Sequence, residues 1–231
     1  MTFKEKMDPN KTTRSADISP RKAAIVAGIG FLMSFVGAIF ASLYVDIGDA
    51  ATTANNIMFG VFGFLIAILG DIIRAWALYV FFKQVNRSLS LLSAWFMLVH
   101  DAIFGAALLN LVFSSLILSG ADYLTVIEPN QLHALALLFS SVYAYGFEIG
   151  LFFFSFHLGI LGYLVFKSGY VPRIMGVLLF IASLGYLINS VGTILSPNFP
   201  EIIWTVFMLP CLIGEMAIVV WLAFRGGKDQ S

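Results

Sequence analysis

Charged residues and cysteine are both scarce in this chain of 231 residues. Only 11% of the residues are charged, and the 13 basic and 13 acidic side chains cancel to a formal net charge of zero. Binding to the phosphate backbone of a nucleic acid needs a positive surplus, so we predict no nucleic-acid partner. The single cysteine, Cys211, excludes an internal disulfide. Because Cys211 lies in an apolar segment, we interpret it as a packing residue.

The sequence also lacks the signatures of common catalytic sites. It contains no phosphate-binding loop, no His-Glu-x-x-His pattern and no Gly-x-Ser-x-Gly pattern. No lysine lies inside an apolar stretch, where it would be needed to hold retinal. We therefore do not predict an enzyme from motifs. The polar residues inside the apolar stretches are the candidates for a functional site.

Apolar residues, in contrast, make up 60% of the chain and give a mean hydropathy of +0.93. Soluble domains are about half apolar, and one helix that crosses the hydrocarbon layer needs about 20 apolar residues. The sequence therefore predicts an all-α polytopic membrane protein, a bundle of six transmembrane helices. The third and fourth apolar stretches exceed the length of one span and must tilt, break or protrude. The six stretches are Ala23 to Tyr44, Ile57 to Phe82, Leu89 to Leu118, His133 to Phe166, Val171 to Ile194 and Ile202 to Phe224.

Lysine and arginine lie almost entirely on one side of the predicted bundle. The opposite loops contain acidic residues and neither Lys nor Arg. Because cytoplasmic loops are enriched in Lys and Arg, we predict an inner (plasma) membrane protein with both termini in the cytoplasm. The 12 basic residues on the predicted cytoplasmic side are Lys4, Lys6, Lys11, Arg14, Arg21, Lys22, Lys83, Arg87, Lys167, Arg173, Arg225 and Lys228.

These segments divide the chain into three parts. Residues 1–22 form a polar tail that we expect to be disordered, with its basic side chains attracted to anionic lipid headgroups. Residues 23–225 form the bundle, and residues 226–231 form a short cytoplasmic tail. Besides the lipid bilayer, a second copy or another membrane protein is a candidate partner. The segment GFEIG, Gly146 to Gly150, has the Gly-x-x-x-Gly spacing that permits close helix contact.

Ionisable residues inside the apolar stretches lie at similar depths. Counted from the nearest cytoplasmic basic residue, Asp71, His100, His157 and Glu215 are 10 to 13 residues into their helices. This distance is roughly 15 to 20 Å along a helix, so we expect four helices to place ionisable groups in one layer. Glu148 lies farther along its helix, and we expect it outside the layer. The ligand-binding or proton-binding candidates are Asp71, Arg74, His100, Asp101, His157 and Glu215.

The layer has three carboxylates and one permanent cation. Asp71 and Arg74 are three residues apart on one helix and can pair directly. Asp101 and Glu215 then need a histidine imidazolium, a bound cation, a water-filled cavity or protonation. An ionised carboxylate without such compensation is too costly at this depth.

Each candidate has a structural and a functional interpretation. Asp71 with Arg74 is either a clamp between helices or a substrate contact. His100 and His157 are either neutral imidazoles that hydrogen-bond to a neighbouring helix or ligands of a metal or haem, and Glu215 completes the set of metal candidates. Glu215 follows a proline that is expected to bend its helix, and such a carboxylate often borders a cavity. We favour Glu215 for a functional role.

The stretch FFFSFHLGILGYLVFKSGYVPRIMGVLLFIASLGYLINS, Phe152 to Ser190, carries a resemblance to a known family. With GDIIRAWALYVFFKQVNRSLSLL and GEMAIVVWLAFRGGK, it resembles the multi-pass prokaryotic membrane family named domain of unknown function 4386. The resemblance covers Pro20 to Gly227 and implies the membrane fold but no activity. The chain departs from the family pattern at Met97, where Arg is common, and at the His100 and Asp101 pair. Residues that match the pattern are Asp71, His157, Pro172, Arg173, Gly176 and Glu215.

Three classes of function remain open. The first is a structural or partner-interaction membrane module whose polar layer holds helices together; a cavity that reaches the layer would count against it. The second is a small-ligand or proton-linked transport or sensing module, with Glu215 and Asp101 as protonatable sites and Arg74 binding an anionic group of an unknown ligand. The third is an intramembrane metal or haem enzyme built from His100, His157 and a carboxylate. We expect the first class and predict no cofactor.

Overall fold

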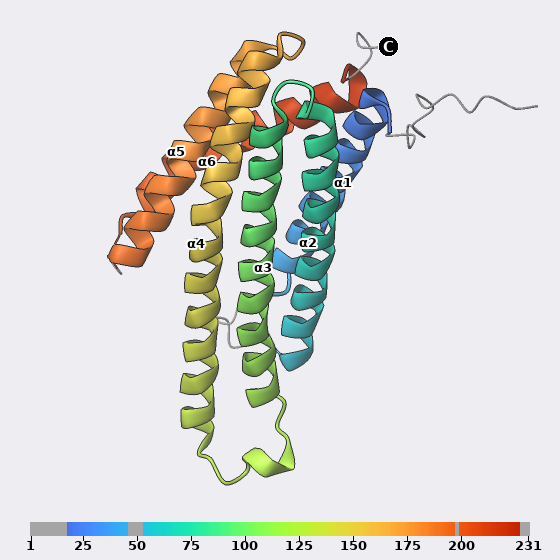
Figure 1. Ribbon diagram of the computed structural model, residues 1–231. Coiled ribbons are helices and arrows are strands. Elements are labelled where there is room, and N and C mark those ends of the chain that lie inside the picture. Colours follow the sequence, from blue (N-terminus) through green and yellow to red (C-terminus); the bar gives the residue numbers. More distant parts are fainter. Residues whose placement is uncertain (1–17, 46–52, 197–198, 227–231) are drawn as a thin grey trace, which may run out of the picture.

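The computed structural model describes residues 18–45, 53–196 and 199–226, and every regular element in these ranges is helical (Figure 1). The all-α prediction is confirmed, and the long helices coincide with the predicted apolar stretches. The predicted tails lie outside the described residues up to residue 17 and from residue 227. The helices are α1 (Pro20–Ser42), α2 (Ala54–Phe82), α3 (Arg87–Ile117), the short 3-10 helix η1 (Asp122–Leu124), α4 (Pro129–Ser168), α5 (Arg173–Leu195) and α6 (Glu201–Phe224).

Five helices, α1 to α5, are long and apolar enough to cross a membrane. In α6 the apolar segment found among the described residues is the shorter Leu212–Phe224. The helices α3 and α4 contain 31 and 40 residues without a break. At 1.5 Å per residue these helices are about 46 Å and about 60 Å long, well beyond a hydrocarbon core of about 30 Å. Figure 1 shows that their hairpin extends beyond the other helices at the end that carries η1.

The long helices form a ring. Each one packs against the next in the chain, and α6 returns to pack against α1. Figure 1 shows α6 running obliquely across the end of the bundle where the C-terminus lies. The guanidinium of Arg21 stabilises the contact between α1 and α6. It donates hydrogen bonds to the carbonyl oxygens of Leu222, Ala223 and Gly226 at 3.2, 2.8 and 3.0 Å. These carbonyls lie at the C-terminal end of α6, where Leu222 also accepts a hydrogen bond from the backbone N–H of Gly226, so the start of α1 caps the end of α6.

Glycines bring α1 and α2 into backbone contact. A Cβ atom on Gly30 would lie 2.7 Å from the carbonyl oxygen of Gly70, and a Cβ on Gly70 would lie 2.5 Å from that of Gly30. One heptad away, Gly37 and Gly63 face each other in the same way, at 2.7 and 2.9 Å. Small residues permit such close approach in lipid, where apolar burial does not drive helices together. The contact holds α1 directly against the part of α2 that carries the predicted polar layer.

Serine hydroxyls add hydrogen bonds between neighbouring helices. Each donates to a backbone carbonyl oxygen on the adjacent helix, which satisfies the hydroxyl in an apolar interior. These bonds fix the register of the helices around the ring. They run from Ser90 Oγ to Tyr79 at 3.0 Å, from Ser115 Oγ to Ala54 at 2.9 Å, from Ser114 Oγ to Ala136 at 2.9 Å and from Ser183 Oγ to Ser155 at 2.8 Å.

Candidate functional site

A cavity of about 360 Å³ lies inside the ring and reaches the predicted polar layer. All of the long helices, α1 to α6, contribute residues to its wall. Four of the six predicted site residues line it together. The polar lining consists of Ser34, Asp71, Arg74, His100, Tyr186 and Glu215, and the aromatic lining adds Phe31, Phe35, Phe64, Phe104, Phe147 and Phe154.

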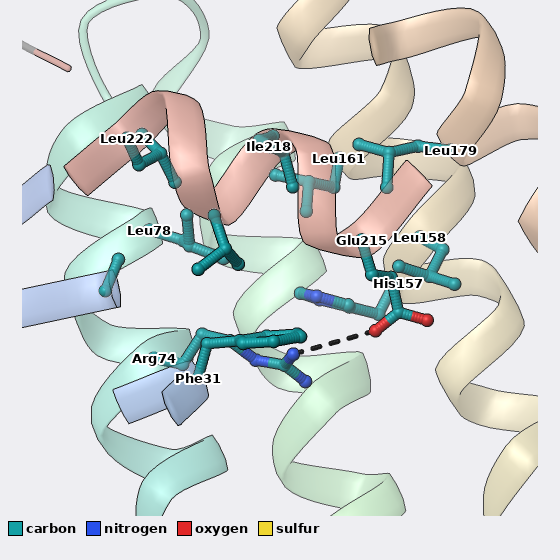
Figure 2. A pocket seen from close by; sticks show the side chains of 12 residues that line it. Phe31, Arg74, Leu78, His157, Leu158, Leu161, Leu179, Glu215, Ile218 and Leu222 are labelled. Atoms are coloured by element: carbon teal, nitrogen blue, oxygen red, sulfur yellow. Dashed lines mark ion pairs between the residues drawn. The ribbon is translucent and has the colours of Figure 1, made fainter. Parts of the chain in front are cut away.

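Arg74 is the centre of the charged cluster on this wall. Its Nη2 lies 2.9 Å from Oδ1 of Asp71, as the spacing of three residues predicts, and its Nη1 lies 3.8 Å from Oε2 of Glu215. The guanidinium carbon is 5.3 Å from the ring centre of Phe31 and 5.9 Å from that of Phe154. Figure 2 shows the Phe31 ring beside the guanidinium and the ion pair to Glu215. Carboxylates of α2 and α6 therefore share one buried cation between two aromatic rings.

Glu215 connects three helices. One carboxylate oxygen faces Arg74 on α2, and the other accepts a hydrogen bond of 3.2 Å from the hydroxyl of Tyr186 on α5. Glu215 thereby attaches α6 to both neighbours while one edge of its side chain lines the cavity. The predicted position of this carboxylate on a cavity wall is confirmed, and its functional role remains a prediction.

His157 lies beside the cluster in a small void of about 20 Å³ that Arg74 and Glu215 also line (Figure 2). One ring nitrogen of His157, Nδ1, is hydrogen-bonded. Nδ1 lies 2.9 Å from the carbonyl oxygen of Ser93 and 3.0 Å from the Ser93 hydroxyl, and the same hydroxyl is 3.2 Å from the carbonyl oxygen of His157. These contacts match a histidine that hydrogen-bonds to a neighbouring helix, here α4 to α3.

His100 and Asp101 are adjacent in sequence but have different surroundings. His100 lines the cavity and packs against the rings of Phe104 and Phe154, with centroid distances of 6.0 and 5.2 Å. A Cβ on Gly150 would come within 3.0 Å of His100 Nδ1, so the glycine makes room for the ring. Asp101 does not line the cavity; it is 3% exposed, and neither carboxylate oxygen has a hydrogen-bond partner among the described residues. Four of the six predicted residues thus line the cavity, His157 lies beside the cluster in the small void, and Asp101 lines neither space.

The three metal candidates, His100, His157 and Glu215, are not brought together as a ligand set. Among the residues that the structure describes, no group of three or more His, Cys, Asp or Glu side chains is arranged to hold a metal ion. The two histidines line different spaces, because His157 lines the small void and His100 lines the larger cavity.

Glu148 does not line the cavity, but depth is not the reason, because its neighbour Phe147 lines the cavity and Gly150 lies against His100. Its carboxylate accepts hydrogen bonds of 3.3 and 3.2 Å from Nδ2 of Asn189, which joins α4 to α5, and it does not line the cavity. The glycines of the GFEIG segment face α3 of the same chain, because Gly146 lies against Ala107 and Gly150 against His100. The close contact that this spacing permits is therefore made within the chain.

Sequence reasoning missed the aromatic and sulfur neighbours of the cluster. Phe31 and Phe154 look like any other phenylalanine in an apolar helix, and Tyr186 carries no pattern that points to Glu215. Met97, at which the chain departs from the family pattern, has its sulfur 3.7 Å from Nη2 of Arg74. That departure is the sequence signal for the contact between Met97 and Arg74.

Comparisons with known proteins agree with the architecture and name no activity. A family model described as "Domain of unknown function (DUF4386)" matches residues 26–226, a range that contains every residue of the cavity wall. An "Uncharacterized protein" of Archaeoglobus fulgidus is 30% identical over 171 residues, which cover 74% of this chain and 86% of that protein. No solved structure matches the chain.

Proposed function

We propose that this chain, which belongs to the DUF4386 family, binds a small molecule inside the membrane and serves transport or sensing. The observation that carries the proposal is the cavity of about 360 Å³ with the charged cluster on its wall. Small-molecule sites typically occupy about 300 to 1,000 Å³, with mostly apolar walls and a few convergent polar groups. The wall of this cavity has that composition.

The same observation counts against a purely structural role for the polar layer. A layer that only holds helices together is expected to be dry and tightly packed. Here Asp71, Arg74 and Glu215 neutralise part of their charge by pairing, yet all three also border open space. The small-ligand alternative therefore replaces the structural module as our preferred function.

Filling the cavity tests this function. We expect Ala38→Trp, which adds an indole to the cavity wall on α1, to weaken ligand binding at least about tenfold, because a bulky ring displaces the occupant. Saturable binding of three tritiated probes of similar shape, 2-phenylethylammonium, 2-phenylethanol and phenylacetate, can be measured in lipid nanodiscs by scintillation proximity.

Ala102→Trp is the matched control, because Ala102 is on the exposed face of α3 and does not line the cavity. This variant should bind like the wild type. Equal loss in both variants, or saturable binding of none of the three probes to the folded wild type, would contradict a ligand site in this cavity.

We further propose that all six long helices span the plasma membrane and that both termini are cytoplasmic. The charge distribution supports this orientation. The helix ends at the α2–α3 and α4–α5 connections and the C-terminal end carry Lys83, Arg87, Lys167, Arg173 and Arg225, whereas the acidic Asp122 and Glu128 flank the α3–α4 connection.

Reporter fusions test the orientation in a bacterial host. We expect green fluorescent protein fused after Ser231 to fluoresce and alkaline phosphatase at that position to be inactive, because phosphatase folds only outside the cytoplasm. Phosphatase inserted after Gly120, in the α3–α4 connection, should be active. The opposite pattern at either position would overturn the orientation.

A further inference from the structure

The charges around the cavity do not balance. Its wall carries two carboxylates, Asp71 and Glu215, against one permanent cation, Arg74, and no lysine lines it. When both carboxylates are ionised and His100 is neutral, the wall therefore has one negative charge more than its positive charge. An occupant that supplies positive charge would relieve this imbalance.

Arg74 is poorly placed to receive an anion. Its Nη2 faces Asp71 at 2.9 Å and its Nη1 faces Glu215 at 3.8 Å. An anionic ligand at the same guanidinium would become the third negative charge around a single positive one. In a low-dielectric interior, such repulsion outweighs the added hydrogen bond. The expected role of Arg74 as the partner of an anionic ligand group is therefore disfavoured by the geometry.

The aromatic wall favours an organic cation over a small inorganic one. Divalent metal ions need several oxygen, nitrogen or sulfur ligands, and the described residues contain no group of three His, Cys, Asp or Glu side chains arranged to hold one. Six phenylalanines line the cavity instead. The faces of aromatic rings attract cations, and the rings also cover an apolar body. This structure already uses that attraction, since Arg74 itself lies over Phe31 and Phe154.

From the charge count, the occupied guanidinium and the aromatic wall together, we infer that the cavity selects a small monocation with an apolar body, of the protonated-amine class. The ammonium group lies toward the carboxylates of Asp71 and Glu215, and the apolar body lies among the phenylalanines. The inference rests on the proposed function, because it names the ligand class of the same cavity.

Three probes of similar shape and different charge test this selectivity. Protein in nanodiscs should bind 2-phenylethylammonium at least about tenfold more tightly than 2-phenylethanol, and phenylacetate more weakly than both, because only the ammonium compensates the wall. Glu215→Gln removes one negative charge at nearly constant shape. In this variant the preference for the amine over the alcohol should fall to less than about threefold.

Glu148→Gln is the matched control, since it makes the same chemical change at a membrane carboxylate that does not line the cavity. It should keep the wild-type preference. If Glu215→Gln does not fold, Asp71→Asn removes the same charge from α2 and should have the same effect on selectivity.

The outcomes separate the two proposals. Saturable binding of 2-phenylethanol or phenylacetate as tight as that of the amine overturns the cation selectivity and leaves the ligand-binding function standing. An unchanged amine preference in a folded Glu215→Gln or Asp71→Asn protein also overturns it. Absence of saturable binding by all three probes in the folded wild type overturns the function and the selectivity together.

Discussion

Arg74→Met should destabilise the helical bundle by about 3 to 5 kcal/mol, the cost observed when one partner of a buried ion pair is removed. Asp71 at 2.9 Å and Glu215 at 3.8 Å would lose their shared cation, and Arg74 is only 8% exposed. Thermal unfolding in detergent, followed by circular dichroism, measures the effect.

The triple variant Arg74→Met, Asp71→Asn, Glu215→Gln is the control for this interpretation. It removes all three charges and leaves no ion without a partner, so most of the lost stability should return. If Arg74→Met unfolds at the wild-type temperature, or if the triple variant is no more stable than the single one, the cluster does not neutralise its carboxylates through Arg74.

The sequence predicts the helices well for a physical reason. A chain inside lipid must satisfy its backbone hydrogen bonds within each segment, so long apolar stretches become helices whatever their partners. The number of residues between a polar residue and the nearest cytoplasmic basic residue of its helix then predicts the depth of that polar residue. The pairing of Asp71 with Arg74 follows from their spacing, and the depth count predicts that Glu215 and His157 lie at the level of that pair.

Helix rotation is what the sequence left undetermined. His100 and Asp101 differ by about 100° around α3, so one side chain borders the cavity and the other does not. The rotation of each helix about its axis depends on which small residues meet at its contact with a neighbouring helix. The chain contains 20 glycines, and the sequence does not show which of them pair between helices. For the same reason, the phenylalanines that enclose Arg74 could not be distinguished from those that face lipid.

Gly70→Ala tests whether these glycine pairs position the site. The added Cβ would lie 2.5 Å from the carbonyl oxygen of Gly30 and 2.5 Å from the amide nitrogen of Ser34. Both atoms belong to the backbone of α1, so the clash cannot be relieved by rotating a side chain and α1 must move away from α2. We expect a loss of about 1 to 3 kcal/mol in stability, the usual cost of overpacking, measured by thermal unfolding.

The displacement should also weaken ligand binding in the cavity, because α1 contributes Phe31, Ser34 and Phe35 to its wall. Gly105→Ala is the matched control, since a Cβ there meets only Ile68 Cδ1 at an ordinary 3.8 Å. That variant should keep its binding and gain up to about 1 kcal/mol from better helix propensity. If Gly70→Ala is as stable as Gly105→Ala and binds the same probes equally well, backbone contact between α1 and α2 does not hold the cavity wall in place.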